Sequence, residues 1–156
     1  MADDLDANLS LARDTRTPGK TLAKLASHKS WTVRADVASN PRTPSKTLLK
    51  LADDKRWEVR TEVALNSNAG GKVLEMLAED PHVSVRTAVA LNPKTPGSAL
   101  RRLAKDKSAV VRLRVAENRN VPSGVLRKLG SDDDRTVRRA AGDNRIGPVL
   151  QGDRIG

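Results

Sequence analysis

The sequence contains no cysteine, phenylalanine or tyrosine, and only two tryptophans among its 156 residues. Without cysteine there is no disulfide framework, no thiolate site for zinc or iron–sulfur clusters and no cysteine nucleophile. No apolar run approaches the roughly 20 residues that a membrane-spanning helix needs, and the acidic start does not resemble a secretion signal. The length suits one domain, for which we expect a cytoplasmic location. Since aromatic rings usually fill protein cores, other side chains must fill this one.

The same residue types recur every 26 positions, which is the main feature of the chain. Two leucine columns, a valine column and an arginine column are filled in five successive copies. The arginine column consists of Arg34, Arg60, Arg86, Arg112 and Arg138. An asparagine column marks the repeat starts and contains Asn40, Asn66, Asn92 and Asn118. Such a period predicts a solenoid of stacked units.

The period divides the chain into one solenoid domain over residues 1–156. The predicted repeats span 14–39, 40–65, 66–91, 92–117 and 118–143. An N-terminal half-repeat at 5–13 precedes them, and a degenerate or frayed tail at 144–156 follows.

A Thr-Pro pair begins the first element of several repeats, as at Thr43 and Pro44. Threonine is a good N-cap and proline is favoured at the first helical position, so the pair predicts a helix start. On a helical wheel Pro44, Leu48 and Leu51 share one face, whereas Lys46 lies opposite. The first element is therefore predicted to be an amphipathic helix.

The second element fits two structures. Val59 and Val63 are spaced as on one face of a helix, but Val59, Thr61, Val63 and Leu65 also alternate as in a strand. Strands would form a parallel sheet and stack the column arginines about 4.8 Å apart, whereas packed helices separate them by about 8–10 Å. Repulsion between the column arginines is weaker at the larger distance, so their spacing favours helices over strands.

Two repeats carry a recognisable pattern. The run Asn-Pro-Arg-Thr-Pro-x-x-x-Leu-x-x-Leu-Ala-Asp-Asp-x-x-x-x-Val-Arg-x-x-Val-Ala at 40–64, and its counterpart at 92–116, resemble the leucine-rich repeat variant family. The resemblance covers nearly the whole chain and implies an all-α, right-handed α-solenoid of five two-helix repeats. It implies that one helix of each repeat is either α-helical or three-ten. Repeats 3 and 5 depart from the pattern, with Ala69-Gly70 and Val121-Pro122 in place of Thr-Pro. The family carries no catalytic motif to transfer.

The arginine column is predicted to form a structural ladder with aspartates. An aspartate precedes the column arginine of its own repeat by six residues in repeats 2 to 5, at Asp54, Asp80, Asp106 and Asp132. The two groups can pair within or between repeats. His28 takes the aspartate position in repeat 1, so Arg34 is expected to lack its partner. The asparagine column is expected to satisfy backbone groups at the turns.

The excess of basic residues, 29 against 19 acidic ones, is the first functional lead. Candidate contacts to nucleic acid or another anion are Lys46, Lys50, Arg101, Arg102, Lys105, Arg114, Arg127 and Lys128. Repeat 4 holds seven bases and two acids, a net charge of +5, whereas repeat 3 holds two bases and three acids, a net charge of −1. A groove that binds a continuous phosphate backbone is not expected to lose its positive charge in the middle repeat. Few aromatic rings are available for base stacking, which also counts against binding of nucleic acid.

Trp31 and Trp57 occupy the same repeat position, at the edge of the apolar stripe of the second element. Tryptophan is enriched where proteins bind one another, so the pair is a candidate contact for a partner. The other interpretation is packing at the boundary of the first repeats.

Nothing in the sequence indicates catalysis. His28 and His82 are not in equivalent positions, and there is no phosphate loop or dinucleotide fingerprint. We expect no enzyme activity, cofactor, metal, membrane contact or small-molecule substrate. The sequence favours a non-catalytic repeat scaffold that presents an extended surface to another protein. Because this chain is basic, that protein can be acidic. The alternative is sequence-independent binding of nucleic acid through the basic surface of repeats 4 and 5.

Overall fold

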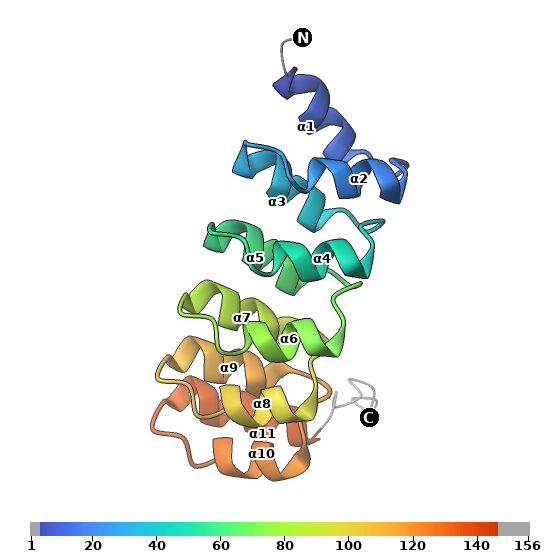
Figure 1. Cartoon of the computed structure of the whole chain (residues 1–156). Coiled ribbons are helices and arrows are strands. Elements are labelled where there is room, and N and C mark those ends of the chain that lie inside the picture. Colours follow the sequence, from blue (N-terminus) through green and yellow to red (C-terminus); the bar gives the residue numbers. More distant parts are fainter. Residues whose placement is uncertain (1–3, 147–156) are drawn as a thin grey trace, which may run out of the picture.

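The computed structural model describes residues 4–146, and its regular secondary structure over that range is entirely helical (Figure 1). The first helices of the five repeats are α2 (Gly19–Leu25), α4 (Ser45–Leu51), α6 (Gly71–Leu77), α8 (Gly97–Leu103) and α10 (Ser123–Leu129). The second helices are α3 (Trp31–Ser39), α5 (Trp57–Leu65), α7 (Val83–Leu91), α9 (Ala109–Glu117) and α11 (Arg135–Ile146). Helix α1 (Leu5–Arg13) precedes them. The predicted all-α solenoid is confirmed.

Both helices of each repeat are α-helices in the part of the chain that the structure describes, so neither a strand nor a three-ten helix forms the second element there. Residues 144–146 of the predicted tail end α11, and the rest of that tail lies outside the described residues.

The helices form two rows along the array. Each second helix packs on the second helix of the next repeat, and α1 packs on α3 in the same way. First helices contact mainly the second helices, and neighbouring first helices share few contacts (Figure 1). The second row is therefore the closely packed side of the solenoid, and grooves separate the first helices.

A thin layer of small side chains fills each repeat. In repeat 2, Leu48 and Leu51 from α4 meet Val59, Val63 and Ala64 from α5, and none of these side chains is more than 2% exposed. Burial of one valine or leucine contributes about 1.5–3 kcal/mol. Because each layer is closed by the next repeat, the core needs no aromatic ring.

The predicted threonine cap is wrong. The N-cap of α4 is Pro44, and no side chain caps the helix start. The hydroxyl of Thr43 donates instead to the carbonyl of Val37 in the last turn of α3, at 2.5 Å, and Thr95 donates to Val89 at 2.6 Å. The threonine hydroxyl thus satisfies a carbonyl at the end of the preceding helix instead of an amide at the start of the next one.

The column arginines pair with aspartates of the next repeat. Arg86 donates from Nε to Oδ2 of Asp106 at 2.6 Å and from Nη2 to Oδ1 at 3.1 Å, while its Nη1 donates to the carbonyl of Asp80 at 2.8 Å. The side chains of Arg86 and Asp106 are 10% and 7% exposed. The same two-bond pairing joins Arg34 to Asp54, Arg60 to Asp80 and Arg112 to Asp132.

The expectation that Arg34 lacks a partner is wrong, because the pairs form between repeats and Asp54 supplies its carboxylate. The column aspartates also accept a hydrogen bond from the backbone amide two residues later, as Oδ1 of Asp54 does from the amide of Arg56 at 2.9 Å. At the equivalent position of repeat 1, Nδ1 of His28 makes this bond by accepting from the amide of Ser30 at 3.0 Å.

The column asparagines also connect successive repeats. The side-chain amide of Asn92 donates to the carbonyls of Ala64 at 2.7 Å and Asn66 at 3.2 Å, and its oxygen accepts from the amide of Lys94 at 2.8 Å. The same pair of donations, to the carbonyls 28 and 26 residues earlier, is made by Asn40, Asn66 and Asn118. These side chains are buried, so their bonds replace water at the carbonyl ends of the second helices.

The first prediction concerns the arginine–aspartate pairs. Arg86→Ala leaves the carboxylate of Asp106 buried without its cation, so we expect the free energy of unfolding to fall by about 3 kcal/mol. Arg138→Ala is the matched control. Arg138 holds the same repeat position, but among the described residues it donates only to the carbonyls of Asp132 and Asp133. Thermal unfolding followed by circular dichroism should show a much smaller loss for the control. Equal losses would mean that the pairs do not hold the repeats together.

The second prediction concerns acid. Burial acts to raise the pKa of Asp106, but hydrogen bonds from Arg86 and from the Ser108 amide bring that pKa below its ordinary value. A depressed pKa stabilises the fold fully above the unfolded value of about 3.9, and this stabilisation is lost as the pH falls through the folded pKa. We therefore expect the Tm to fall steeply below about pH 4. Arg86→Ala should weaken this dependence, and an unchanged Tm in acid would contradict the prediction.

Candidate binding surfaces

An apolar groove of about 410 Å³ runs over the exposed face of the second-helix row. We name it the second-row groove; it is lined by Thr61, Leu65, Val83, Ser84, Thr87, Ala88, Leu91, Ser108 and Val110. Leu65, Leu91 and Val110 are 48%, 46% and 53% exposed. These three side chains point away from the core because the valines and alanines of the same helices face it. Contiguous exposed apolar surface of this kind is typical of a binding site.

Charges of opposite sign flank this groove. Glu62, Ala88 and Arg114 hold the same repeat position on α5, α7 and α9, and Ala88 lines the groove between the other two. Burial raises the pKa of Glu62, and the charge of Asp36 raises it further. Arg114 donates to Glu117 at 2.7 Å, while its buried Nε has no hydrogen-bond partner among the described residues. The groove thus has an acidic side and a basic side.

The two tryptophans each contact a side chain of the next repeat rather than one another. The guanidinium carbon of Arg56 lies 4.9 Å from the ring centroid of Trp31. The ring of Trp57 stacks on His82, with centroids 4.1 Å apart and planes 9° from parallel. More than a third of each indole remains exposed, at 36% and 39%. Packing at the boundary therefore leaves surface for a partner.

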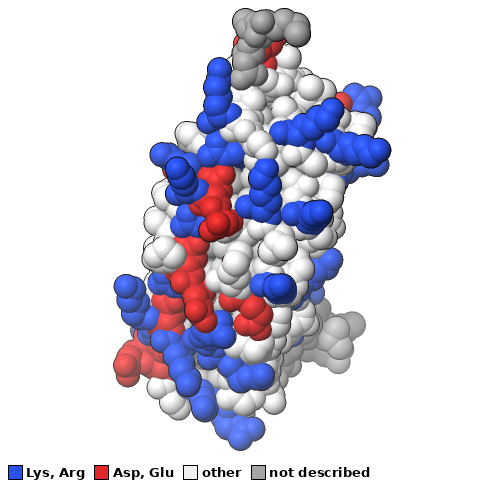
Figure 2. Space-filling view, in the orientation of Figure 1, with Lys and Arg blue, Asp and Glu red and all other residues white. Residues whose placement is uncertain are grey.

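The predicted anion contacts do not form one patch. Lys46 and Lys50 lie on α4, and the amino group of Lys50 donates to the hydroxyl of Ser27 at 2.5 Å. Arg102 on α8 pairs with Glu79 at 3.0 Å and lies 3.5 Å from an oxygen of Glu75. Figure 2 shows a band of acidic side chains along the array between the basic ones.

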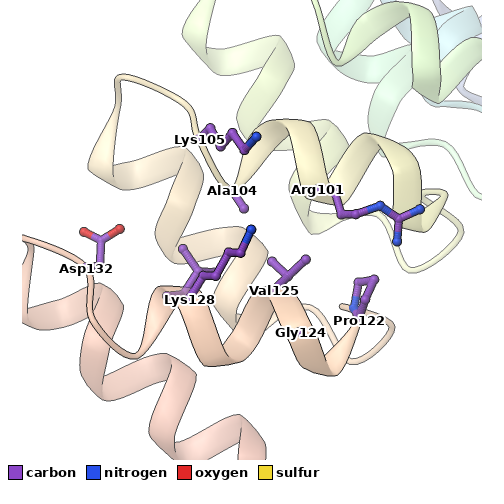
Figure 3. Close-up of a pocket in the computed structure, with 9 residues that line it drawn as sticks. Arg101, Ala104, Lys105, Pro122, Gly124, Val125, Lys128 and Asp132 are labelled. Carbon is purple, nitrogen blue, oxygen red and sulfur yellow. The ribbon is translucent and has the colours of Figure 1, made fainter.

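The remaining predicted contacts divide between the two rows. Arg114 belongs to α9 in the second row, and Arg127 belongs to α10 in the first. Arg101, Lys105 and Lys128 do come together, around a groove between α8 and α10 of about 390 Å³ (Figure 3). We name it the α8–α10 groove; its other lining residues are Ala104, Pro122, Gly124, Val125, Leu129 and Asp132.

The floor of the α8–α10 groove is apolar and its rim is basic. Val125 and Leu129 are 6% and 2% exposed, so they are anchored in the core beneath the groove. Arg101, Lys105 and Lys128 make no ion pair with any residue in the described range. The carboxylate of Asp132, by contrast, is held by Arg112 at 2.8 Å.

Sequence reasoning missed the second-row groove. Leu65 and Leu91 directly precede the column asparagine, where repeats 1 and 4 carry Ser39 and Glu117. This difference between repeats was the available signal, whereas the columns that predict the fold consist of residues that all repeats share.

His82 caps the start of α7, and His28 fixes the turn before α3. Nδ1 of His82 accepts from the amide of Ser84 at 3.3 Å, as His28 accepts from Ser30. Within residues 4–146, no group of three or more histidine, aspartate and glutamate side chains is arranged to hold a metal ion. No helix in the same range is long and apolar enough to cross a membrane.

Comparison with known proteins identifies the repeat. The family model described as leucine rich repeat variant matches residues 31–55, 57–82 and 84–108. A solved structure described as a leucine-rich repeat variant with a novel repetitive protein structural motif matches with a TM-score of 0.72 at 28% sequence identity. The match covers 92% of this chain and 57% of the solved one, so this chain spans little more than half of that length. No curated protein matches. The chain belongs to the leucine rich repeat variant family.

Proposed function

We propose that the chain is a non-catalytic repeat scaffold that binds another protein through its second-helix row. The second-row groove is the observation that carries this proposal, because it exposes leucine and valine side chains that the fold does not need for its core. A volume of about 410 Å³ accommodates a few apolar side chains of a partner.

The shape and the charges of the groove favour an amphipathic segment of the partner, bound along it. Glu62 on one side and Arg114 on the other would favour one orientation, with basic groups of the segment near Glu62 and acidic groups near Arg114. Val83, which lines the groove, holds the repeat position of Trp31 and Trp57, so their exposed parts belong to the same row of helices nearer the N-terminus.

Sequence-independent binding of nucleic acid has less support. Arg102 and Arg114 are already paired with glutamates, and acidic side chains interrupt the basic surface (Figure 2). A phosphate backbone would need an uninterrupted row of available cations.

The third prediction tests the second-row groove. Peptides selected from a random library for binding to the purified protein should lose affinity about tenfold or more with Leu91→Asp, because a carboxylate then lies in the apolar contact. Leu49→Asp is the matched control: Leu49 is 43% exposed, as against 46% for Leu91, but lies on α4 in the other row. Fluorescence anisotropy measures both affinities.

Two results would contradict the proposal. One is that the selected peptides bind the Leu91→Asp protein as tightly as the original. The other is that no peptide is enriched, while a short DNA duplex binds at low salt and dissociates steeply as salt rises, which is the signature of phosphate contacts.

A further inference from the structure

We propose that the α8–α10 groove is a second binding site, which takes an acidic segment of a partner protein. Carboxylates of that segment pair with Arg101, Lys105 and Lys128, and an apolar side chain between them lies on Val125. This site is on the first-helix row and is independent of the second-row groove.

The neighbouring repeat shows how carboxylates fill the equivalent groove. Between α6 and α8, Glu75 and Glu79 hold the repeat positions of Arg101 and Lys105, and Arg102 holds the position of Lys128. Arg102 lies 3.0 Å from Glu79 and 3.5 Å from Glu75, so the chain supplies its own acids there.

Three differences reverse this arrangement between α8 and α10. Arg101 and Lys105 replace the two glutamates, so they line the same groove as Lys128 and only cations stand where the ion pair would form (Figure 3). Gly124 replaces Ser98, whose hydroxyl donates to Glu75 in the neighbouring groove. The first two changes remove the acids, and the third removes the side chain that would narrow the groove.

Like charges held together are stabilised by an anion from outside. Arg101, Lys105 and Lys128 find no carboxylate in the described part of the chain, whereas Arg102 finds two. A partner that presents two carboxylates about one helical turn apart reproduces the spacing of Glu75 and Glu79. Such charge-assisted contacts are strongest beside apolar surface, where water is excluded.

The chemistry of the groove favours a peptide over a nucleic acid. Its floor is formed by Pro122, Val125 and Leu129, which suit an aliphatic side chain and offer no ring for base stacking. Asp132 also lines the groove, and Glu75 and Glu79 lie against Arg102 of α8, so a polyanion that continued beyond the three cations would meet carboxylates. The three cations therefore suit a short acidic segment with an apolar residue.

The test uses a fluorescein-labelled peptide of about twelve residues that carries glutamates around one leucine, measured by anisotropy. We expect the full chain to bind it. Replacement of the peptide's glutamates by glutamine, or of its leucine by serine, should each weaken binding about tenfold.

Two protein variants test charge and shape separately. Arg101→Glu with Lys105→Glu installs the acids of repeat 3, and we expect about a tenfold loss or more. Lys20→Glu with Lys24→Glu on α2 changes the net charge equally and should lose far less. Gly124→Leu fills the groove without changing its charge, and an added Cβ at Gly124 meets no atom within 4 Å. We expect this variant to fold with an unchanged Tm and to lose the peptide.

Several results would overturn the proposal. They are wild-type affinity in the folded Gly124→Leu protein, equal losses in the two double variants, or displacement of the peptide by a short DNA duplex as readily as by unlabelled peptide. The Leu91→Asp protein should bind the acidic peptide as the wild type does. Failure of the second-row groove is thereby distinguished from failure of this site.

Discussion

Repeats 1 to 4 each hold a column arginine that is largely shielded from solvent and takes its carboxylate from the next repeat, and the stack depends on this pairing. Arg86 is 8% exposed and lies in the apolar stripe of α7, where a lone cation would be very costly. Asp106 accepts hydrogen bonds from Nε and Nη2 of this arginine, and its Oδ1 also accepts from the amide of Ser108 just before α9. One aspartate thus fixes the turn before a helix and connects two repeats, which favours a single register for neighbouring units.

The asparagine column makes the same connection at the other end of the second helices. Asn92 bonds the carbonyls of Ala64 and Asn66, where helix α5 ends and would otherwise leave acceptors without donors. With polar pairs fixing the register at both ends, the apolar layer between them has only to fill space. Leucine, valine and alanine do so without large rings, which accounts for the missing phenylalanine and tyrosine.

The period of 26 residues was enough to predict the buried columns and the solenoid, but it left both helix and strand open for the second element. It could not decide the direction of pairing, because Asp54 is six residues before Arg60 and twenty after Arg34, and both spacings repeat equally well. The threonine cap was wrong for a related reason. Thr43 follows one helix and precedes another, and only the three-dimensional turn shows that its hydroxyl donates to the carbonyl of Val37. Periodic columns predict which residues hold the repeats together, but they do not show which atoms those residues contact.

The candidate sites lie where the columns change. Positions shared by all repeats are occupied by bonds between neighbours, so they have little left to offer a partner. The variable positions face solvent, and there a single exchange alters the surface without disturbing the stack. From α5 to α9 one such column changes from Glu62 through Ala88 to Arg114, which gives the second-row groove its polarity. Between repeats 3 and 4 another changes from Glu75 to Arg101, which converts a closed ion pair into an open basic rim. In a solenoid held by identical contacts, specificity for a partner can reside only in such differences.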